Sequence, residues 1–428
     1  MTISLLSAHT LLASYAVTGL LTVVLLIVTR RSWRALLIAA AVGAGVGVLL
    51  TWWLGDVIDV LGVAPTSVDR VWVAVACALL AVAVVGLVRG RALTKGIAAV
   101  LVPAAVLSAG LAVNRDAGLF PTVTEALGQS HIRALRLPDD RHPSGQQADV
   151  AHWQAPADMP RTGRYGSVTI PGSVSRFPAR PAVVYLPPAA LVEHAPMLPV
   201  VVMLSGQGPG AAPANIVEAG RMASRLDALA AEHHGLAPIV VMPDQLGEAT
   251  RNPMCVDGPL GDSATYLTRD VPDWVREHLH VAAGPSNWAI SGFSQGGTCA
   301  LQLGATDPDL FGSWIDVSGQ LGPTLQDRSD TVARGFGGDE RAYEDAQPLR
   351  ILQQDAPYSA SAAFIAAGAD DHRYGPNVQR VAAAAEAAGV QVTAHLVPDG
   401  GHDWHTAGHA LQEGVAWFMR RTGLAEPR

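Results

Sequence analysis

The chain has 428 residues, of which 49% are hydrophobic and 15% charged, a composition that excludes a disordered chain and argues against a wholly soluble one. The formal net charge of −8 is uneven, because residues 1–113 carry 7 basic and 3 acidic side chains and the remainder carries 22 and 34. Since neutralising phosphates requires basic groups, the acidic remainder makes a nucleic-acid partner unexpected.

Four segments of the N-terminal part lack charged residues and are long enough to cross a bilayer, which takes about 20 apolar residues. A cleaved signal peptide would explain only the first of them. None has a charged or histidine side chain in mid-span, as transporters usually do, so we predict a four-helix membrane anchor over residues 1–113. Gly43 and Gly47 form a G-x-x-x-G pattern, which indicates close helix packing. The segments are Leu12–Thr29, Ala35–Leu54, Val71–Val88 and Gly96–Val113.

The loops between these segments predict the orientation of the anchor. Lys and Arg favour the cytoplasmic side of a membrane. The first and third loops are basic, whereas the second has three Asp and one basic residue, Arg70. We therefore expect a multi-pass protein of the cell membrane, with the N-terminus and everything after Val113 outside the cytoplasm. The basic residues of the inner loops are Arg30, Arg31 and Arg34, and Arg89, Arg91 and Lys95.

The remainder of the chain has a different pattern. Residues 114–164 are rich in Pro, Asp and His, and we predict a linker there with one short helix near Val123–Leu137. Residues 165–428 alternate short β-branched runs with helical patterns, which indicates an α/β fold with a mostly parallel, doubly wound sheet. The predicted strands are Gly166–Ile170, Ala182–Leu186, Val200–Leu204, Ile239–Met242, Trp288–Ile290, Ser313–Val317, Ala363–Ala367 and Val390–Leu396, and the predicted helices are Ile216–His234, Tyr266–His278, Gln295–Gly304, Pro376–Ala388 and Gly408–Arg421.

A G-x-S-x-G motif, Gly292 to Gly296, follows the strand Trp288–Ile290 and precedes a helical pattern. This context presents a serine hydroxyl on a sharp turn, and the two glycines allow close approach of strand and helix. The helix N-terminus directs backbone N–H groups at developing negative charge. We predict Ser294 as a nucleophile; the alternative is a glycine-rich turn with a buried serine.

A nucleophilic hydroxyl needs a base, and the base needs an orienting acid, in the chain order Ser, acid, His. His402 follows a strand and two glycines, and we predict it as the base. Asp371 follows the preceding predicted strand and is the predicted acid, with Asp370 as the alternative. One of the two Asp residues is expected to cap a helix instead.

An oxyanion hole needs two backbone donors. The N–H of Gln295, directly after the nucleophile, is the first. The strand Val200–Leu204 leads into a glycine-rich turn from Ser205 to Gly210, and Gln207 N–H is the predicted second donor. The alternative is a plain flexible turn.

Two further patterns suggest a metal site and a disulfide. His402, His405 and His409 would meet a zinc ion if they shared one helix. We predict no metal, because His402 follows two glycines before the helix and no H-E-x-x-H is present. Cys255 and Cys299 both lie in the second part, where an oxidising compartment would permit a disulfide, and the sequence leaves that bridge open.

Together these motifs resemble the esterase family of α/β-hydrolases that includes esterase D, the enterochelin esterases and the antigen 85 mycolyltransferases. The resemblance covers roughly Gly166 to Phe418 and is strongest at Gly292–Gly296, Gly368–Asp371 and Gly400–Trp404. It implies an α/β-hydrolase fold and a Ser-His-Asp acyl-transfer site. Antigen 85-type enzymes use Glu as the acid, and family members often have His-Gly or Asp-Gly where this chain has Ser205-Gly206. The membrane part looks instead like a membrane-bound actinobacterial subgroup.

We therefore expect an outward-facing serine esterase or acyltransferase that uses no cofactor. Tethering near the bilayer favours acyl or aminoacyl esters of cell-envelope lipids or glycolipids as substrates. The alternative is a non-catalytic binding or assembly module on a hydrolase fold. The acidic segment Leu321–Pro357 is expected to form either a lid or a solvated insertion, and the sequence does not indicate an oligomeric state.

Overall fold

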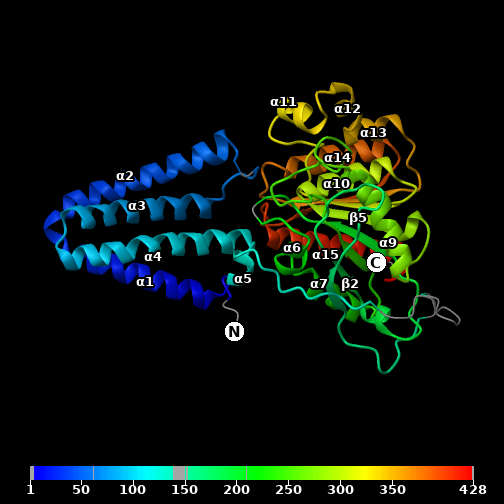
Figure 1. Cartoon of the computed structure of the whole chain (residues 1–428), viewed down its shortest axis with the longest axis horizontal. Coiled ribbons are helices and arrows are strands. Elements are labelled where there is room, and N and C mark those ends of the chain that lie inside the picture. Colours follow the sequence, from blue (N-terminus) through cyan, green and yellow to red (C-terminus); the bar gives the residue numbers. More distant parts are fainter. Residues whose placement is uncertain (1–3, 61, 138–149, 151–152, 209, 427–428) are drawn as a thin grey trace. The chain divides into compact units, whose positions relative to one another are not determined.

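The computed structural model describes residues 4–60, 62–137, 150, 153–208 and 210–426. The chain divides into two compact units, Met1–Gln129 and Ser130–Arg428 (Figure 1). The division falls within the segment predicted as a linker, because helix α4 (Ala92–Ala117) extends past Val113 and Ala134 pairs with Ser167. Residues 138–149 and 151–152 of that predicted linker lie outside the described residues. The predicted helix near Val123–Leu137 is only one turn, α5 (Val123–Ala126).

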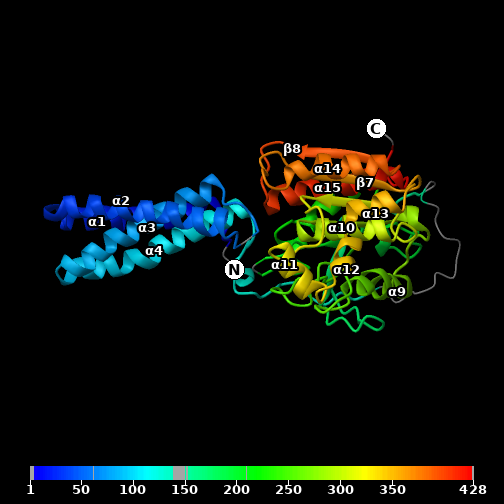
Figure 2. The same cartoon turned by 90° about the horizontal axis from the view of Figure 1, so that it is seen from above.

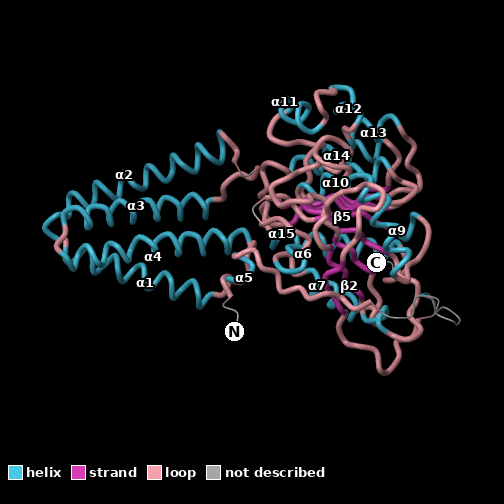
Figure 3. The backbone as a smooth tube through the Cα atoms, viewed as in Figure 1, coloured by secondary structure: helices cyan, strands magenta, loops and turns pink. Residues whose placement is uncertain are grey.

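Four helices of the described residues are long and apolar enough to cross a membrane, and all belong to the first unit (Figure 3). Each predicted segment matches one of them, the first running one residue past the end of its helix, so the first unit is suited to membrane association. Helix ends follow local chemistry: Ser7 Oγ accepts the Thr10 N–H, and Thr66 and Asp69 cap each other's backbone. The helices are α1 (Ala8–Val28), α2 (Trp33–Thr51, continued by the π-helical turn η2, Trp52–Val57), α3 (Ser67–Arg89) and α4.

The two glycines of the G-x-x-x-G pattern lie at the contact between α2 and α3 in the first unit. A Cβ on Gly43 would lie 2.4 Å from the Cys77 carbonyl oxygen, and one on Gly47 would lie 2.6 Å from the Cα of Ala74. Only a glycine permits this backbone approach between α2 and α3. The predicted close packing is confirmed.

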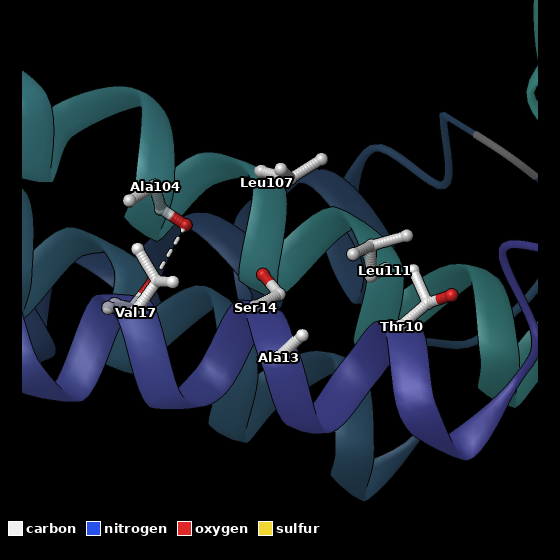
Figure 4. A pocket seen from close by; sticks show the side chains of 8 residues that line it. Thr10, Ala13, Ser14, Val17, Ala104, Leu107 and Leu111 are labelled. Carbon is white, nitrogen blue, oxygen red and sulfur yellow. Dashed lines mark hydrogen bonds between the residues drawn. The ribbon is translucent and has the colours of Figure 1, made fainter. Parts of the chain in front are cut away.

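Helices α1 and α4 are joined by hydroxyl groups. Ser108 Oγ of α4 lies 2.7 Å from Ser14 Oγ and 2.8 Å from Thr18 Oγ1, and Thr18 Oγ1 also donates to the Ala104 carbonyl oxygen. Beside them lies a pocket of about 290 Å³ lined by both helices (Figure 4). These bonds satisfy polar groups that would be costly to leave unpaired in hydrocarbon.

In the second unit the described residues form an eight-stranded sheet with the order β1-β2-β4-β3-β5-β6-β7-β8. Strand β2 pairs antiparallel with both of its neighbours, β1 at the edge and β4, and the other neighbouring strands are parallel. The mostly parallel sheet is therefore confirmed. The strands are β1 (Arg164–Val168), β2 (Ala182–Leu186), β3 (Val200–Leu204), β4 (Ile239–Met242), β5 (Trp288–Phe293), β6 (Ser313–Val317), β7 (Ala362–Gly368) and β8 (Gln391–Val397).

Helices cover both faces of this sheet, as Figures 1 and 2 show. Successive residues of a strand point to opposite faces. In β6, Ile315 packs against Gly414 of α15 (Trp404–Arg421), and Asp316 packs against Gly297 of α10 (Gln295–Thr306). Helices α10 and α15 therefore lie on opposite faces. The other helical segments of this unit are η4 (Pro188–Leu191), α6 (Ala214–Glu218), α7 (Met222–Glu232), α8 (Ser263–Thr265), η5 (Tyr266–Asp270), α9 (Val271–His278), η6 (Pro285–Asn287), α11 (Arg328–Asp330), η7 (Thr331–Gly335), α12 (Glu340–Asp345), α13 (Pro348–Gln354) and α14 (Gly375–Ala387).

One predicted helix is interrupted. The segment Ile216–His234 forms α6 and α7, with a break at Gly220 and Arg221, whose φ of 55° is left-handed. The cause is tertiary: a Cβ on Gly408 of α15 would lie 2.5 Å from the Gly220 carbonyl oxygen, so α15 crosses the chain closely at this break. Helix α15 also begins earlier than predicted, because the Asp403 carboxylate accepts the N–H groups of His405 and Thr406.

Cys255 and Cys299 form a disulfide, which resolves the alternative that the sequence left open. It joins the loop after β4 to helix α10. The segment Leu321–Pro357 forms α11, η7, α12 and α13 and packs on this loop, since a Cβ on Gly258 would lie 2.7 Å from the Gly335 carbonyl oxygen.

Candidate active site

Ser294 lies at a sharp turn between β5 and α10, with φ 57° and ψ −117°. The flanking glycines make this turn sterically possible. A Cβ on Gly292 would lie 2.2 Å from the Gly296 carbonyl oxygen, and one on Gly296 would lie 2.5 Å from the carbonyl oxygens of Leu204 and Ser205. Any larger residue at either position would push the strand and the helix apart.

The loop after β8 brings His402 to this serine. Its Nε2 atom lies 3.0 Å from Ser294 Oγ, and its Nδ1 atom lies 2.8 Å from Asp371 Oδ2. Since a carboxylate only accepts hydrogen bonds, Nδ1 carries the proton and Nε2 can accept the serine hydroxyl. The three side chains thus form one continuous relay.

The electrostatics of Asp371 favour its ionised form. Burial raises the pKa of this carboxyl, but the hydrogen bond and charge of His402 and the backbone N–H groups of Tyr374 and Arg373 outweigh burial, so the pKa is lowered. Oδ1 accepts both N–H groups, at 2.9 and 3.2 Å, which leaves Oδ2 for the imidazole. The competing residue Asp370 is exposed, and the structure does not bring it to His402.

Close backbone packing and aromatic rings hold the imidazole. A Cβ on Gly368 would lie 2.1 Å from the Gly400 carbonyl oxygen, so the acid loop and the histidine loop touch through their backbones. The His402 ring lies 4.8 Å from the Phe293 ring and 4.6 Å from the Tyr374 ring, measured between centroids. Both aromatic side chains are buried, and no sequence pattern indicated a role for either of them.

The two residues predicted to line the oxyanion hole lie on either side of Ser294. Gln295 is the first residue of α10, and a Cβ on Gly206 would lie 3.4 Å from Ser294 Cβ, so the turn that carries Gln207 lies against the serine. Two residues absent from the sequence predictions join them: Gln245 donates to Gln295 Oε1 at 2.9 Å, and Asn252 donates to Gln207 Oε1 at 2.8 Å. No local motif marks them, because each lies in an irregular loop.

The histidine pattern that suggested a metal is divided by the fold. His402 precedes α15 and faces Ser294, whereas His409 lies within α15 with its Nε2 atom 3.4 Å from Glu413 Oε1. Among the described residues, no group of three or more His, Cys, Asp or Glu is arranged to hold a metal ion.

Comparisons with known sequences identify a family. A family model described as "Putative esterase" matches residues 179–418, more than half of the chain. A Corynebacterium glutamicum protein described as uncharacterized is 35% identical over 261 residues, which cover 60% of this chain and 61% of that relative. The MPT51/MPB51 antigen of Mycobacterium bovis is 36% identical over 77 residues, 17% of this chain and 25% of the antigen. Both matches span less than two thirds of the relative's own length.

Among solved structures, an S-formylglutathione hydrolase from Agrobacterium tumefaciens is similar to this chain, with a TM-score of 0.52 and 19% identity. The similarity covers 62% of this chain and 97% of that structure. At this identity the likeness concerns the fold alone, and it confirms the predicted α/β-hydrolase fold.

Proposed function

We propose that the chain, which belongs to this esterase family, is a carboxylic ester hydrolase with Ser294, His402 and Asp371 as its catalytic triad. The observation that carries the proposal is the relay from hydroxyl to imidazole to carboxylate, with distances of 3.0 and 2.8 Å. The strained backbone of Ser294 supports it, because such strain is concentrated at functional sites.

In the proposed mechanism Ser294 Oγ attacks the ester carbonyl carbon while His402 Nε2 takes the hydroxyl proton. The tetrahedral intermediate then breaks its bond to the leaving alcohol, which receives that proton from His402. Water or a second alcohol attacks the acyl-enzyme with His402 again as base, and the acyl product leaves as Ser294 is restored. Asp371, whose pKa is lowered, stays ionised and stabilises the imidazolium formed in each half-reaction.

We assign the oxyanion to the backbone N–H groups of Gln207 and Gln295. The N-terminus of α10 adds partial positive charge at the same place. A donor of this kind contributes about 3 kcal/mol of transition-state stabilisation. The close approach of Gly206 to Ser294 supports the assignment.

We further propose that residues 1–113 anchor the enzyme, with residues 114–164 as a linker and residues 165–428 as a catalytic domain outside the cytoplasm. The basic loops of the anchor support this orientation. The Cys255–Cys299 disulfide supports it independently, because such bonds persist in oxidising compartments. An anchored site meets envelope lipids at high effective concentration, so the proposed substrates are acyl or aminoacyl esters of lipids or glycolipids.

The test is labelling of the detergent-solubilised protein with a fluorophosphonate probe, together with turnover of a p-nitrophenyl ester. Wild type is expected to label and turn over, and Ser294→Ala is expected to do neither. Ser313→Ala is the matched control, since its buried hydroxyl in β6 has no hydrogen-bond partner among the described residues. Turnover by Ser294→Ala would remove the proposed nucleophile, and an unreactive wild type would favour a non-catalytic binding module.

A further inference from the structure

A continuous series of hydrogen bonds between four side-chain amides begins and ends on the turn that faces Ser294. We refer to this series as the amide ring. Gln245 Nε2 donates to the Ser205 carbonyl oxygen at 2.6 Å and to Gln295 Oε1 at 2.9 Å. Gln295 Nε2 donates to Asn252 Oδ1 at 3.0 Å, and Asn252 Nδ2 donates to Gln207 Oε1 at 2.8 Å. The chain of amides thus starts and ends on the same turn, on either side of Gly206.

The direction of this ring is determined at both ends by backbone groups. The Met254 N–H donates to the Asn252 side chain at 2.9 Å, so the atom that it meets must be Oδ1, and the other atom must be the donor Nδ2. The Ser205 carbonyl oxygen can only accept, so Gln245 must present Nε2 to it. The amides of Gln245 and Gln295 therefore have a single orientation in which donors meet acceptors along this series, while Gln245 Oε1 itself has no hydrogen-bond partner among the described residues.

The disulfide anchors the loop that carries Asn252. Cys255 is bonded to Cys299, which lies one helical turn after Gln295 in α10. Met254 and Cys255 both have positive φ, 61° and 52°, a conformation that non-glycine residues rarely keep unless their surroundings hold them. Asn252 Nδ2 also donates to the Thr324 carbonyl oxygen at 3.2 Å, so the loop is joined to the following insertion too.

We propose that Asn252 is a positioning residue that holds Gln207, and with it the second oxyanion donor, against Ser294, and that the Cys255–Cys299 disulfide keeps Asn252 in place. This inference rests on the proposed serine esterase function. The reason is geometric: the Gln207 side chain is exposed, and its bond to Asn252 ties the turn to the nucleophile helix. Without that hydrogen bond, the backbone N–H of Gln207 is no longer held close to the oxyanion. This weakens only interactions that are made in the transition state.

The decisive variants are Asn252→Ala and Asn252→Asp. Alanine removes all four of these side-chain hydrogen bonds of Asn252. Aspartate keeps an acceptor for Met254 and Gln295 but replaces the donor with a second oxygen, which faces the Thr324 carbonyl oxygen and Gln207 Oε1. Turnover of a p-nitrophenyl ester is divided by the number of sites that a fluorophosphonate titrates. Both variants are expected to lose about tenfold to a hundredfold in kcat per titrated site, with KM nearly unchanged. Asn287→Asp, whose side chain donates to the Ala283 carbonyl oxygen, is the matched control with wild-type kcat.

Coupling between the residues gives the second readout. If Asn252 acts through Gln207, the double variant Asn252→Ala with Gln207→Ala falls no further than either single variant. Cys255→Ser with Cys299→Ser is expected to lower kcat to the same degree, again without further loss when Asn252→Ala is added.

The outcomes separate this inference from the proposed function. A wild-type protein that neither labels nor turns over overturns both. With an active wild type, Asn252 variants within twofold of wild type per titrated site overturn the positioning role. A loss confined to the number of titratable sites overturns it as well, since that is the result of impaired folding. A folded disulfide-free variant with wild-type kcat overturns the role of the disulfide.

Discussion

The carboxyl group of Asp316 lies directly beneath Gly297, with its Oδ1 atom 2.6 Å from the position that a Cβ at residue 297 would take. This carboxyl is buried against the start of α10 and accepts a hydrogen bond from the Gly319 N–H at 3.0 Å. Burial raises its pKa to about 7, and the Gly319 bond offsets only part of that rise. A carboxyl that is protonated below neutrality thus supports the helix that carries Gln295.

This arrangement predicts a pH-dependent stability. Between pH 3.8 and about 7 the folded protein holds the Asp316 proton and the unfolded chain does not, so the free energy of unfolding falls as pH rises through that window. The loss amounts to as much as about 4 kcal/mol. The isosteric neutral variant Asp316→Asn is expected to lose less stability than wild type between pH 5 and pH 8, measured by thermal unfolding. An equal loss in both proteins would contradict the prediction.

Asp371 and Asp370 are adjacent in the chain, so their asparagine variants form a matched pair. Asp371→Asn is expected to lower kcat by about 10³- to 10⁴-fold, because the amide favours the wrong imidazole tautomer. Asp370→Asn is expected to keep nearly all activity, since that side chain is exposed and does not contact His402. Steady-state turnover of a p-nitrophenyl ester measures both. The opposite ranking would show that Asp370 is the acid.

Gly43 and Gly45 of α2 differ in the space that is available for a side chain. Gly43→Ala would place its Cβ 2.4 Å from the Cys77 carbonyl oxygen, and it is expected to destabilise the helix pair by about 1–3 kcal/mol. Nothing lies within 4 Å of a Cβ at Gly45, so Gly45→Ala is the control, with stability within about 0.5 kcal/mol of wild type. Thermal unfolding in detergent compares them. Equal melting temperatures would exclude tight α2–α3 packing.

The proposed orientation predicts which cysteines are accessible in intact cells. In a Cys77→Ser background, Arg341→Cys is expected to react with a membrane-impermeant maleimide, because that side chain is 91% exposed in the proposed outer domain. Arg31→Cys, in a basic loop, is expected to react only after the cells are permeabilised. Labelling of Arg31→Cys but not Arg341→Cys in intact cells would reverse the orientation.

Much of the fold was predictable because the relevant forces are local. Four of the predicted strands, such as Val200–Leu204, have the bounds of the observed ones, since β-branched runs between turns determine strand position. The G-x-S-x-G motif placed Ser294 between strand and helix for a similar reason: Gly292 and Gly296 contact each other across only four residues. The break at Gly220 was not predictable, because it depends on α15 crossing nearly 190 residues later in the chain.

The sequence by itself therefore determined the strand and helix pattern, the membrane-suited segments and the positions of Ser294 and His402. Only the tertiary structure decided that Asp371 rather than Asp370 meets the imidazole, that Cys255 pairs with Cys299, and that Asn252 joins the turn of Gln207 to α10. The physical reason is that periodicity reports which face a residue occupies. The direction of a side chain in an irregular loop depends on partners that only the folded chain brings within hydrogen-bond distance.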